Sequence, residues 1–232
     1  MKNESNNFKL NCIHHIPLFR VLNEDEKNSV FDFVYTKKYK AGELIYRPNE
    51  KASSIYIVSS GKIRIYRLAE NGKEQLLRIL IPGDFTGELA LFKEGIYEAY
   101  AESIEDTTLC MINHYDFKKL LTKYPLLSTK MLEVLANRLS SSEEQTAWIA
   151  TETVRDRLIH YLSRIAPLNN EHEKIINLNI TKKDLASYLG TTPESLSREW
   201  TKLENENIIK QLNKKKVKLI GFSFELNSCI IV

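Results

Sequence analysis

A long stretch without glycine or proline most constrains how this chain can fold. Residues Leu126 to Ala166 contain neither residue type, and these are the residues that most often end a helix. The stretch therefore predicts one long helix, or one helix broken once into two. Before it, Tyr39 to Ile112 consists of short β-type runs separated by turn signals, of which Asn71-Gly72 is a strong hairpin signal. Short strands about ten residues apart predict a small antiparallel barrel or roll.

This change from short β-type runs to a long helical stretch predicts an α+β chain with three regions. We expect a β-roll domain, with an N-terminal arm, in residues 1–125. A helix and hinge should follow in 126–152, and a small domain in 153–232. The net charge of +3 comes entirely from residues 151–232, because acidic and basic side chains cancel in 1–150. A basic C-terminal domain makes a polyanionic partner for that end worth testing.

Composition excludes several classes of protein. The chain is 43% hydrophobic and 27% charged, which is typical of a soluble globular protein. Its apolar runs are too short for a membrane span, and its first residues lack the apolar core of a signal peptide. We therefore expect a cytoplasmic protein without a membrane partner. Nucleotide P-loop, H-E-x-x-H and G-x-S-x-G motifs are absent, so we do not expect an enzyme.

The long helix carries side chains at alternating intervals of three and four. These positions follow the a/d spacing of a coiled-coil seam; they are Leu132, Leu135, Leu139, Ser142, Thr146 and Ile149. One interpretation is a dimerisation helix whose polar centre, Ser142 and Thr146, could meet a ligand. The alternative is a solvated helix surface lying against the β domain. We favour dimerisation, because a surface helix has little reason to keep this register.

The segment "ITKKDLASYLGTTPESLSREWTKLENENIIK" predicts two helices across a tight turn. Thr181 with Asp184 is a capping-box pattern that begins the first helix, and Gly190 can adopt the positive φ that ends it. Thr191 or Thr192 can cap the second helix, with Pro193 in its first turn. Two helices joined in this way form a helix-turn-helix unit.

The second helix separates into two faces. Leu196, Trp200 and Leu203 recur at helical spacing and should pack inward, whereas Glu194, Ser197, Arg198 and Thr201 should face outward. An arginine can bind guanine O6 and N7, a glutamate can accept from cytosine N4, and a serine can contact a base edge or a thymine methyl. We assign these roles to Arg198, Glu194 and Ser197. The predicted DNA-binding set is completed by Thr192, Thr201, Lys202 and Lys182.

The last part of this domain, "IIKQLNKKKVKLIGF", predicts two short strands with a lysine-rich tip. Such a wing suits phosphate contacts, which add affinity without sequence choice. A winged helix-turn-helix that binds double-stranded DNA is our favoured interpretation. The alternatives are a purely structural helix pair and a module whose C-terminal domain binds protein.

Over essentially its whole length the chain resembles the CRP/FNR family of bacterial transcription regulators. The resemblance rests on "PGDFTGELALF" in the roll, the long helix, and "DLASYLGTTPESLSREWTKLE", whose E-x-x-S-R string is typical of the FNR branch. It implies a cyclic-nucleotide-binding-like roll of double-stranded jelly-roll type as sensor domain. It also implies a homodimer on a palindrome with TTGA-like half-sites, and RNA polymerase as a partner if the protein activates.

The resemblance also identifies a candidate effector pocket: Gly87, Glu88, Glu98 and Ala99, with Ser142 and Thr146 on the helix. In family members that bind cyclic AMP, the Gly-Glu pair binds the ribose, and an Arg-Ser pair further on binds the cyclic phosphate. Here Gly87-Glu88 is present, but Glu98-Ala99 stands in place of the second pair. A carboxylate facing a phosphodiester opposes binding. We therefore expect no control by cyclic AMP. The loop should instead be structural, closing the roll against the long helix, with Leu89, Leu91 and Phe92 in the core.

Cysteines provide a second candidate signal. Oxygen-sensing FNR proteins hold an iron–sulfur cluster on four cysteines, but here only Cys12 and Cys110 occupy comparable positions. A cluster is disfavoured, unless His14 or His15 substitutes or a dimer shares ligands. The pair resembles that of FNR-like proteins of Gram-positive bacteria proposed to switch by an intramolecular disulfide. A reversible Cys12–Cys110 bond and two ordinary thiols are equally weighted hypotheses.

Other cofactors have little support in the sequence. The C-x-H-H spacing of Cys12, His14 and His15 matches no established metal-ligand pattern, and we predict neither a metal site nor a cofactor. Cys229 is expected to be inert. Regulation by an unidentified small molecule or haem in the roll, or by no ligand at all, stays open.

Overall fold

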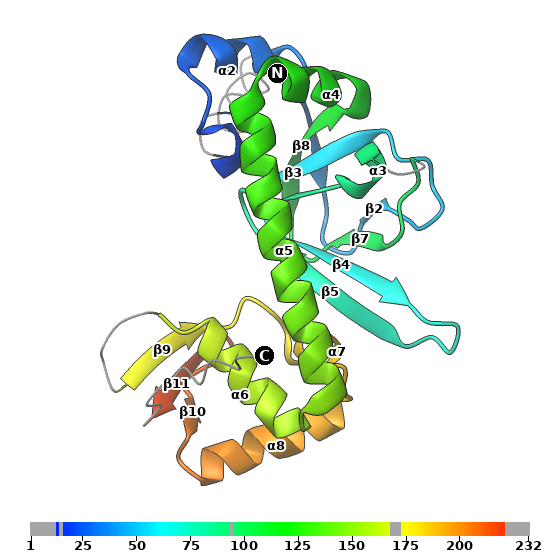
Figure 1. The fold of residues 1–232 in the computed structure, drawn as a ribbon. Coiled ribbons are helices and arrows are strands. Elements are labelled where there is room, and N and C mark those ends of the chain that lie inside the picture. The colour runs from blue at the N-terminus through cyan, green and yellow to red at the C-terminus, as the bar shows by residue number, and fades with distance from the viewer. Residues whose placement is uncertain (1–12, 14–15, 93–94, 168–172, 221–232) are drawn as a thin grey trace, which may run out of the picture. The chain divides into compact units, whose positions relative to one another are not determined.

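The chain divides into two units, residues 1–142 and 143–232. A computed structural model describes residues 13, 16–92, 95–167 and 173–220. Helix α5 (Pro125–Thr151) runs through the boundary between the units, and α6 (Val154–Arg164) follows it (Figure 1). The predicted long helix is thus broken once, at Glu152 and Thr153. The boundary between the two units lies within α5, and the division into domains at 125 and 152 stays a prediction.

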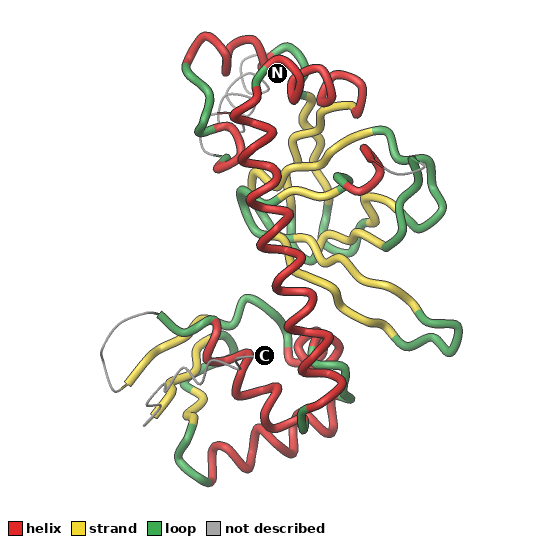
Figure 2. Tube along the Cα trace, in the orientation of Figure 1, coloured by secondary structure: helices red, strands yellow, loops and turns green. Residues whose placement is uncertain are grey.

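The first unit is built on two four-stranded antiparallel sheets (Figure 2). One sheet has the order β1-β8-β3-β6 and the other β2-β7-β4-β5. The hairpin β4–β5 turns at Asn71-Gly72, as the sequence predicts, and projects from the roll in Figure 1. The strands are β1 (Tyr35–Tyr39), β2 (Leu44–Tyr46), β3 (Ser54–Ser60), β4 (Ile63–Leu68), β5 (Glu74–Leu80), β6 (Phe85–Thr86), β7 (Tyr100–Ser103) and β8 (Thr107–Asn113).

The strands β3 and β8 are buried on both faces of their sheet. Tyr56, Val58 and Leu109 point into a core that they share with the second sheet. The alternate residues Ile57 and Cys110 belong to a separate core formed with the helices. Because side chains alternate along a strand, the near-continuous apolar runs of β3 and β8 indicate this double burial.

Short helices complete the first unit. They are the 3₁₀ helix η1 (Pro17–Phe19), α2 (Glu24–Phe31), α3 (Leu89–Phe92) and α4 (His114–Lys123). The expectation that Leu89, Leu91 and Phe92 all lie in the core is wrong for two of them. Leu91 is buried, but Leu89 and Phe92 are 50% and 65% exposed. In a single helical turn, residues three apart share one face, so Leu89 and Phe92 point together to solvent when Leu91 points inward.

The second unit combines helices with a three-stranded antiparallel sheet. Helices α7 (Lys182–Tyr188) and α8 (Pro193–Asn205) follow α6, and the sheet has the order β10-β11-β9. Its strands are β9 (Glu173–Asn177), β10 (Ile209–Gln211) and β11 (Lys216–Ile220). The β10–β11 pair was predicted, whereas β9 was not. Across the described part of both units, helices that could span a membrane are not found.

Candidate nucleic-acid interface

Local capping fixes the helix-turn-helix. Thr181 caps α7 by accepting a hydrogen bond from the backbone N–H of Asp184, and Thr192 caps α8 through Ser195 N–H. Pro193 occupies the first turn of α8, where its missing N–H costs nothing. Between the helices Gly190 has φ +65°, a conformation that side-chain-bearing residues rarely adopt. The turn therefore forms as the sequence predicts.

Helix α8 presents the two predicted faces. Leu196, Trp200 and Leu203 are fully buried. The opposite face lines an open groove and consists of exposed side chains: Pro193, Glu194, Ser197, Arg198, Thr201 and Lys202. The structure thus brings together five of the seven residues predicted to bind DNA, on one helix face and within reach of a single ligand surface.

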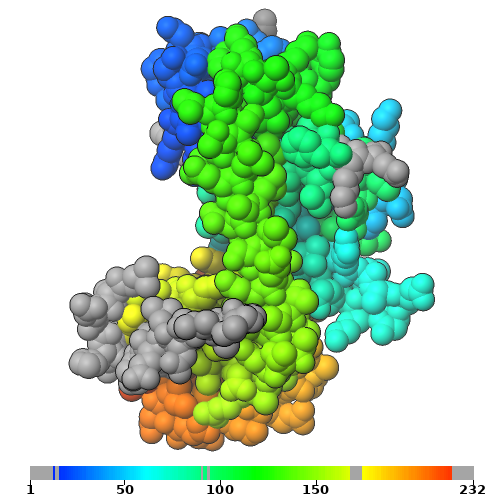
Figure 3. Space-filling view, viewed as in Figure 1, coloured from blue at the N-terminus to red at the C-terminus, as the bar shows by residue number. Residues whose placement is uncertain are grey.

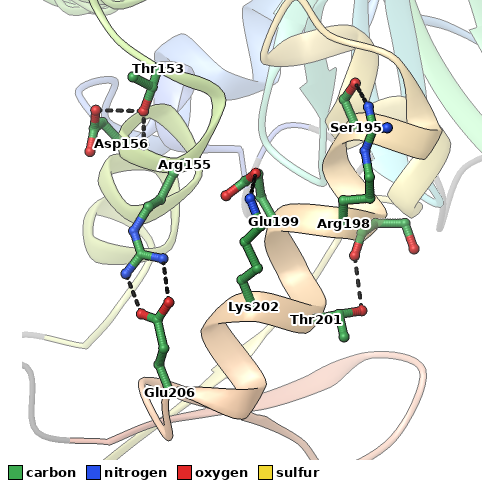
Figure 4. Close-up of polar contacts among 10 residues, drawn as sticks. Thr153, Arg155, Asp156, Ser195, Arg198, Glu199, Thr201, Lys202 and Glu206 are labelled. Atoms are coloured by element: carbon green, nitrogen blue, oxygen red, sulfur yellow. Dashed lines mark hydrogen bonds and ion pairs between the residues drawn. The ribbon is translucent and has the colours of Figure 1, made fainter.

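Hydrogen bonds and ion pairs join side chains on the exposed face of α8 (Figure 4). Arg198 Nη2 donates to Ser195 Oγ at 3.0 Å, and Lys202 Nζ lies 2.7 Å from Glu199 Oε1. The pKa of Glu194 is lowered, chiefly by a hydrogen bond from its own backbone N–H and then by the Thr192 hydroxyl. Glu194 is therefore an ionised acceptor at neutral pH, as a contact to cytosine N4 requires.

The other two predicted residues lie at helix N-termini. Thr192 is the N-cap of α8, so its hydroxyl already accepts a backbone N–H. Lys182 begins α7, and its Nζ lies 4.2 Å from the centre of the Trp200 ring. Burial lowers the pKa of Lys182. A lysine packed on an aromatic ring in this way retains its charge near the helix-turn-helix but reaches less far than an extended one.

The wing carries exposed lysines at its tip. Asn213 Oδ1 accepts the backbone N–H groups of Lys215 and Lys216, which shapes the turn between β10 and β11. Lys214, Lys215 and Lys216 are all exposed. The unpredicted strand β9 pairs with β11 and makes the wing a three-stranded sheet instead of a lone hairpin.

An ion pair that sequence reasoning missed supports the end of α8. Arg155, on α6, donates from Nη1 to Glu206 Oε1 at 2.9 Å and from Nη2 to Glu206 Oε2 (Figure 4). The hydrogen bond from Arg155 lowers the pKa of Glu206. The two residues are 51 positions apart, and charged residues at that separation give no local signal of pairing.

In the roll, the candidate effector residues of the loop line one small cavity of about 80 Å³, which also touches Arg67, Arg78, Tyr46 and Tyr97. Gly87, Glu88, Glu98 and Ala99 all belong to it. Ser142 is exposed on α5 and does not line the cavity, and Thr146, which is also exposed, belongs to the second unit. The carboxylate of Glu98 lies 2.7 Å from Arg67 Nη2, so an arginine from this chain already neutralises it.

Glu88 is buried between two arginines. Its Oε1 lies 3.0 Å from Arg78 Nη2 and 2.8 Å from Arg138 Nη1, and Arg138 Nη2 also donates to Phe85 O at 2.8 Å. Arg138 belongs to α5, so this contact joins the helix to the loop. The loop does close the roll against the long helix, as expected, through a residue that the sequence did not single out.

The structure describes one of the two cysteines in the disulfide hypothesis, Cys110. Cys110 is completely buried in β8, opposite Ile57 of β3 and Thr36 of β1, and it is disulfide-bonded. The other cysteines of the chain, Cys12 and Cys229, lie outside the described residues, as do His14 and His15. Within the ranges that the structure describes, groups of three or more metal-ligating side chains are not found.

Comparison with known proteins agrees with this architecture. Residues 36–124 match the model of the cyclic nucleotide-binding domain, and residues 156–220 match that of the Crp-like helix-turn-helix domain. The chain is 32% identical, over 204 residues, to the probable transcriptional regulator flp of Lacticaseibacillus casei, covering 88% of this chain and 92% of that protein. The cyclic AMP receptor protein of Thermus thermophilus is 28% identical over 199 residues, 84% of this chain and 88% of that protein.

Among solved structures, a CooA mutant from Carboxydothermus hydrogenoformans has a TM-score of 0.76 at 24% identity, covering 88% of this chain and 91% of the other. At that identity the likeness shows the fold alone. The relatives matched by sequence are regulators of transcription and not enzymes. Since both domain models match in order and the flp protein aligns over most of both chains, the chain belongs to the CRP/FNR family of DNA-binding transcription regulators.

Proposed function

We propose that the protein is a sequence-specific regulator that binds, as a homodimer, a palindrome with TTGA-like half-sites. The outward face of α8 carries this proposal. Arg198 supplies a guanidinium for guanine, Glu194 an ionised acceptor for cytosine, and Ser197 a hydroxyl, all exposed on the same side of one helix. They lie in the first half of α8, the part of a recognition helix that reaches base edges.

Exposed leucines on α5 support the homodimer. Leu132 and Leu139 are 66% and 61% exposed, and a spacing of seven residues places them on one side of the helix. Leu135 instead packs against the helical core of the first unit. The part of α5 that belongs to the first unit has one side uncovered in the space-filling view (Figure 3). A second copy of the same helix would bury these leucines and supply the two-fold symmetry that a palindrome requires.

Gel-shift titration over a range of salt concentrations tests this function. We expect a TTGA-type palindrome to be retained with higher affinity than a base-scrambled duplex of equal length, with both affinities falling steeply as salt rises. A palindrome with one half-site scrambled serves as the control for dimeric binding. Equal affinity for all three duplexes would refute the proposal and favour a C-terminal domain that binds protein.

We propose, as a second element of the function, that the redox state of Cys110 controls DNA affinity. The disulfide bond of Cys110 supports this. Ile13, the residue after Cys12, packs in the same core cluster as Cys110, which favours Cys12 as its partner. In the switch, two protein thiols reduce one low-molecular-weight disulfide to two small thiols, and the protein gains one disulfide, so protons and electrons balance.

Peptide mapping and DNA binding of one sample, oxidised and reduced, test the switch. We expect a linked peptide that contains Cys12 and Cys110, and operator affinities that differ between the two states. Cys12→Ser should abolish both effects, whereas Cys229→Ser should abolish neither. A linked sample that binds the operator as tightly as the reduced one would show that the bond is structural.

We propose further that cyclic AMP is not the effector. Glu98 occupies the position at which the family resemblance leads us to expect a phosphate-binding side chain. Arg67, a cationic residue of the cavity wall, already forms an ion pair with Glu98. Isothermal titration calorimetry with cyclic AMP should give no binding heat, and a measurable heat would overturn this part of the proposal.

A further inference from the structure

The carbonyl end of α7 is held by side chains from two other helices of the second unit. Gln145, in the last part of α5, donates from Nε2 to Tyr188 O at 2.8 Å. Arg157, on α6, donates from Nη1 to Leu189 O. A third residue, Arg164 of α6, donates from Nη2 to the Tyr188 hydroxyl at 2.6 Å.

Gln145 and Arg157 donate to groups that the helix itself leaves unsatisfied. The last carbonyls of a helix lack intrahelical partners and form the negative end of its dipole. Arg157 is buried, and its hydrogen bonds run to carbonyl oxygens, those of Thr153 and Leu189. A buried guanidinium needs such partners, because an uncompensated buried charge is strongly destabilising. Breaking the hydrogen bond from Arg157 to the end of α7 would therefore be energetically costly.

The two carbonyl groups that accept these hydrogen bonds lie directly before the turn into α8. Tyr188 and Leu189 directly precede Gly190, and α8 begins at Pro193. There is also little free space behind the turn, since a Cβ at Gly190 would lie 3.3 Å from Arg157 Nη1 and 3.4 Å from Ile149. The contacts that hold the end of α7 thus also fix where the chain turns into α8.

We propose that Gln145 and Arg157 are positioning residues for sequence reading: they hold the turn so that Arg198, Glu194 and Ser197 meet base edges in register. This rests on the function proposed above. Phosphate contacts tolerate small displacements of α8, whereas a bidentate contact to a base does not. Loss of a positioning residue should therefore lower specific affinity more than non-specific affinity.

Gln145→Met tests this in the full-length protein, because methionine keeps the length and neutrality of the side chain but cannot donate to Tyr188 O. We expect the ratio of affinities for the palindrome and its scrambled duplex to fall about tenfold, with affinity for the scrambled duplex changed less than twofold. Glu144→Gln, an exposed neighbour on the same helix, should keep the wild-type ratio. Gln145→Lys restores a donor and should recover most of the ratio.

Stability is measured in parallel by tryptophan fluorescence, since Trp148 and Trp200 both lie in the second unit. Arg157→Met is a second variant if it folds, and it should lower the ratio in the same direction. If Gln145→Met keeps the wild-type ratio, or weakens specific and non-specific binding equally, the positioning role is refuted and the hydrogen bond is only structural. If the wild type itself shows no preference for the palindrome, the proposed function fails first, and the positioning role fails with it.

Discussion

Arg138 Nη1, on α5, lies 2.8 Å from Oε1 of the buried Glu88 in the loop before α3. The side chain of Glu88 is only 2% exposed, so its charge depends on Arg138 and Arg78 for compensation. The contact between α5 and the loop therefore contributes to the stability of the first unit.

Arg138→Met should destabilise the first unit by about 2–3 kcal/mol, because it leaves a buried carboxylate with one partner fewer. Urea unfolding followed by circular dichroism measures the destabilisation, and tryptophan fluorescence provides a reference for the second unit. Lys130→Met is the matched control on the same helix. Its partner Glu133 is largely exposed, so we expect less than about 0.5 kcal/mol. Equal effects of the two variants would contradict the assignment.

Arg198→Ala should weaken operator binding by about 1–3 kcal/mol and relax the preference at one guanine of each half-site. The guanidinium donates to Ser195 Oγ on its own exposed helix face, so its removal should leave the fold intact. Fluorescence anisotropy with operators substituted at each position measures both effects. Asn205→Ala, an exposed change at the end of α8, should alter neither. An Arg198→Ala protein with the wild-type base profile would show that another residue reads the guanine.

Replacing Lys214 and Lys215 by glutamine should weaken binding to the palindrome and the scrambled duplex to the same extent. Both lysines are exposed at the tip of the wing, where they can bind phosphates but not base edges. The slope of log K against log salt should become shallower by about 1 for each phosphate that is no longer neutralised. Lys73→Gln, on the exposed hairpin of the roll, should leave the slope unchanged. A selective weakening for the palindrome would instead assign the wing to base reading.

The stability of the first unit should fall as the pH drops below about 6.5, the ordinary pKa of histidine. Burial lowers the pKa of His114, whose Nε2 lies 3.2 Å from Gly87 O. The unfolded chain then takes up a proton before the folded one does, so the stabilisation is complete above the unfolded pKa and is lost as the pH falls towards the folded one. Urea titrations by circular dichroism from neutral pH to about one unit below that pKa measure this. His114→Gln should flatten the profile, and His160→Gln, in the second unit, should not.

Sequence patterns predicted what depends on local periodicity and turn chemistry. The two faces of α8 followed from its 3.6-residue repeat, since the buried Leu196, Trp200 and Leu203 recur every three or four positions. The β4–β5 hairpin followed from Asn71-Gly72. Both signals lie within a few residues of the element that they predict, so neither depends on contacts with the rest of the chain.

Contacts between distant residues could not be predicted in the same way. Glu88 and Arg138 are 50 positions apart, and nothing in either neighbourhood specifies the pairing. The bond from Gln145 to Tyr188 O uses a backbone acceptor, which every residue offers. Strand β9 was missed because adjacent isoleucines, Ile175 exposed and Ile176 buried, do not show the alternation of a half-buried strand.

The two faces of α8 have a consequence for how such regulators diversify. The side chains that hold the helix in place, Leu196, Trp200 and Leu203, are separate from the exposed ones that we propose to contact DNA. Exchanging Glu194 or Ser197 would therefore alter the preferred operator at little cost to folding. Duplicated copies of one gene could acquire different target sites in this way, while the scaffold around them is preserved.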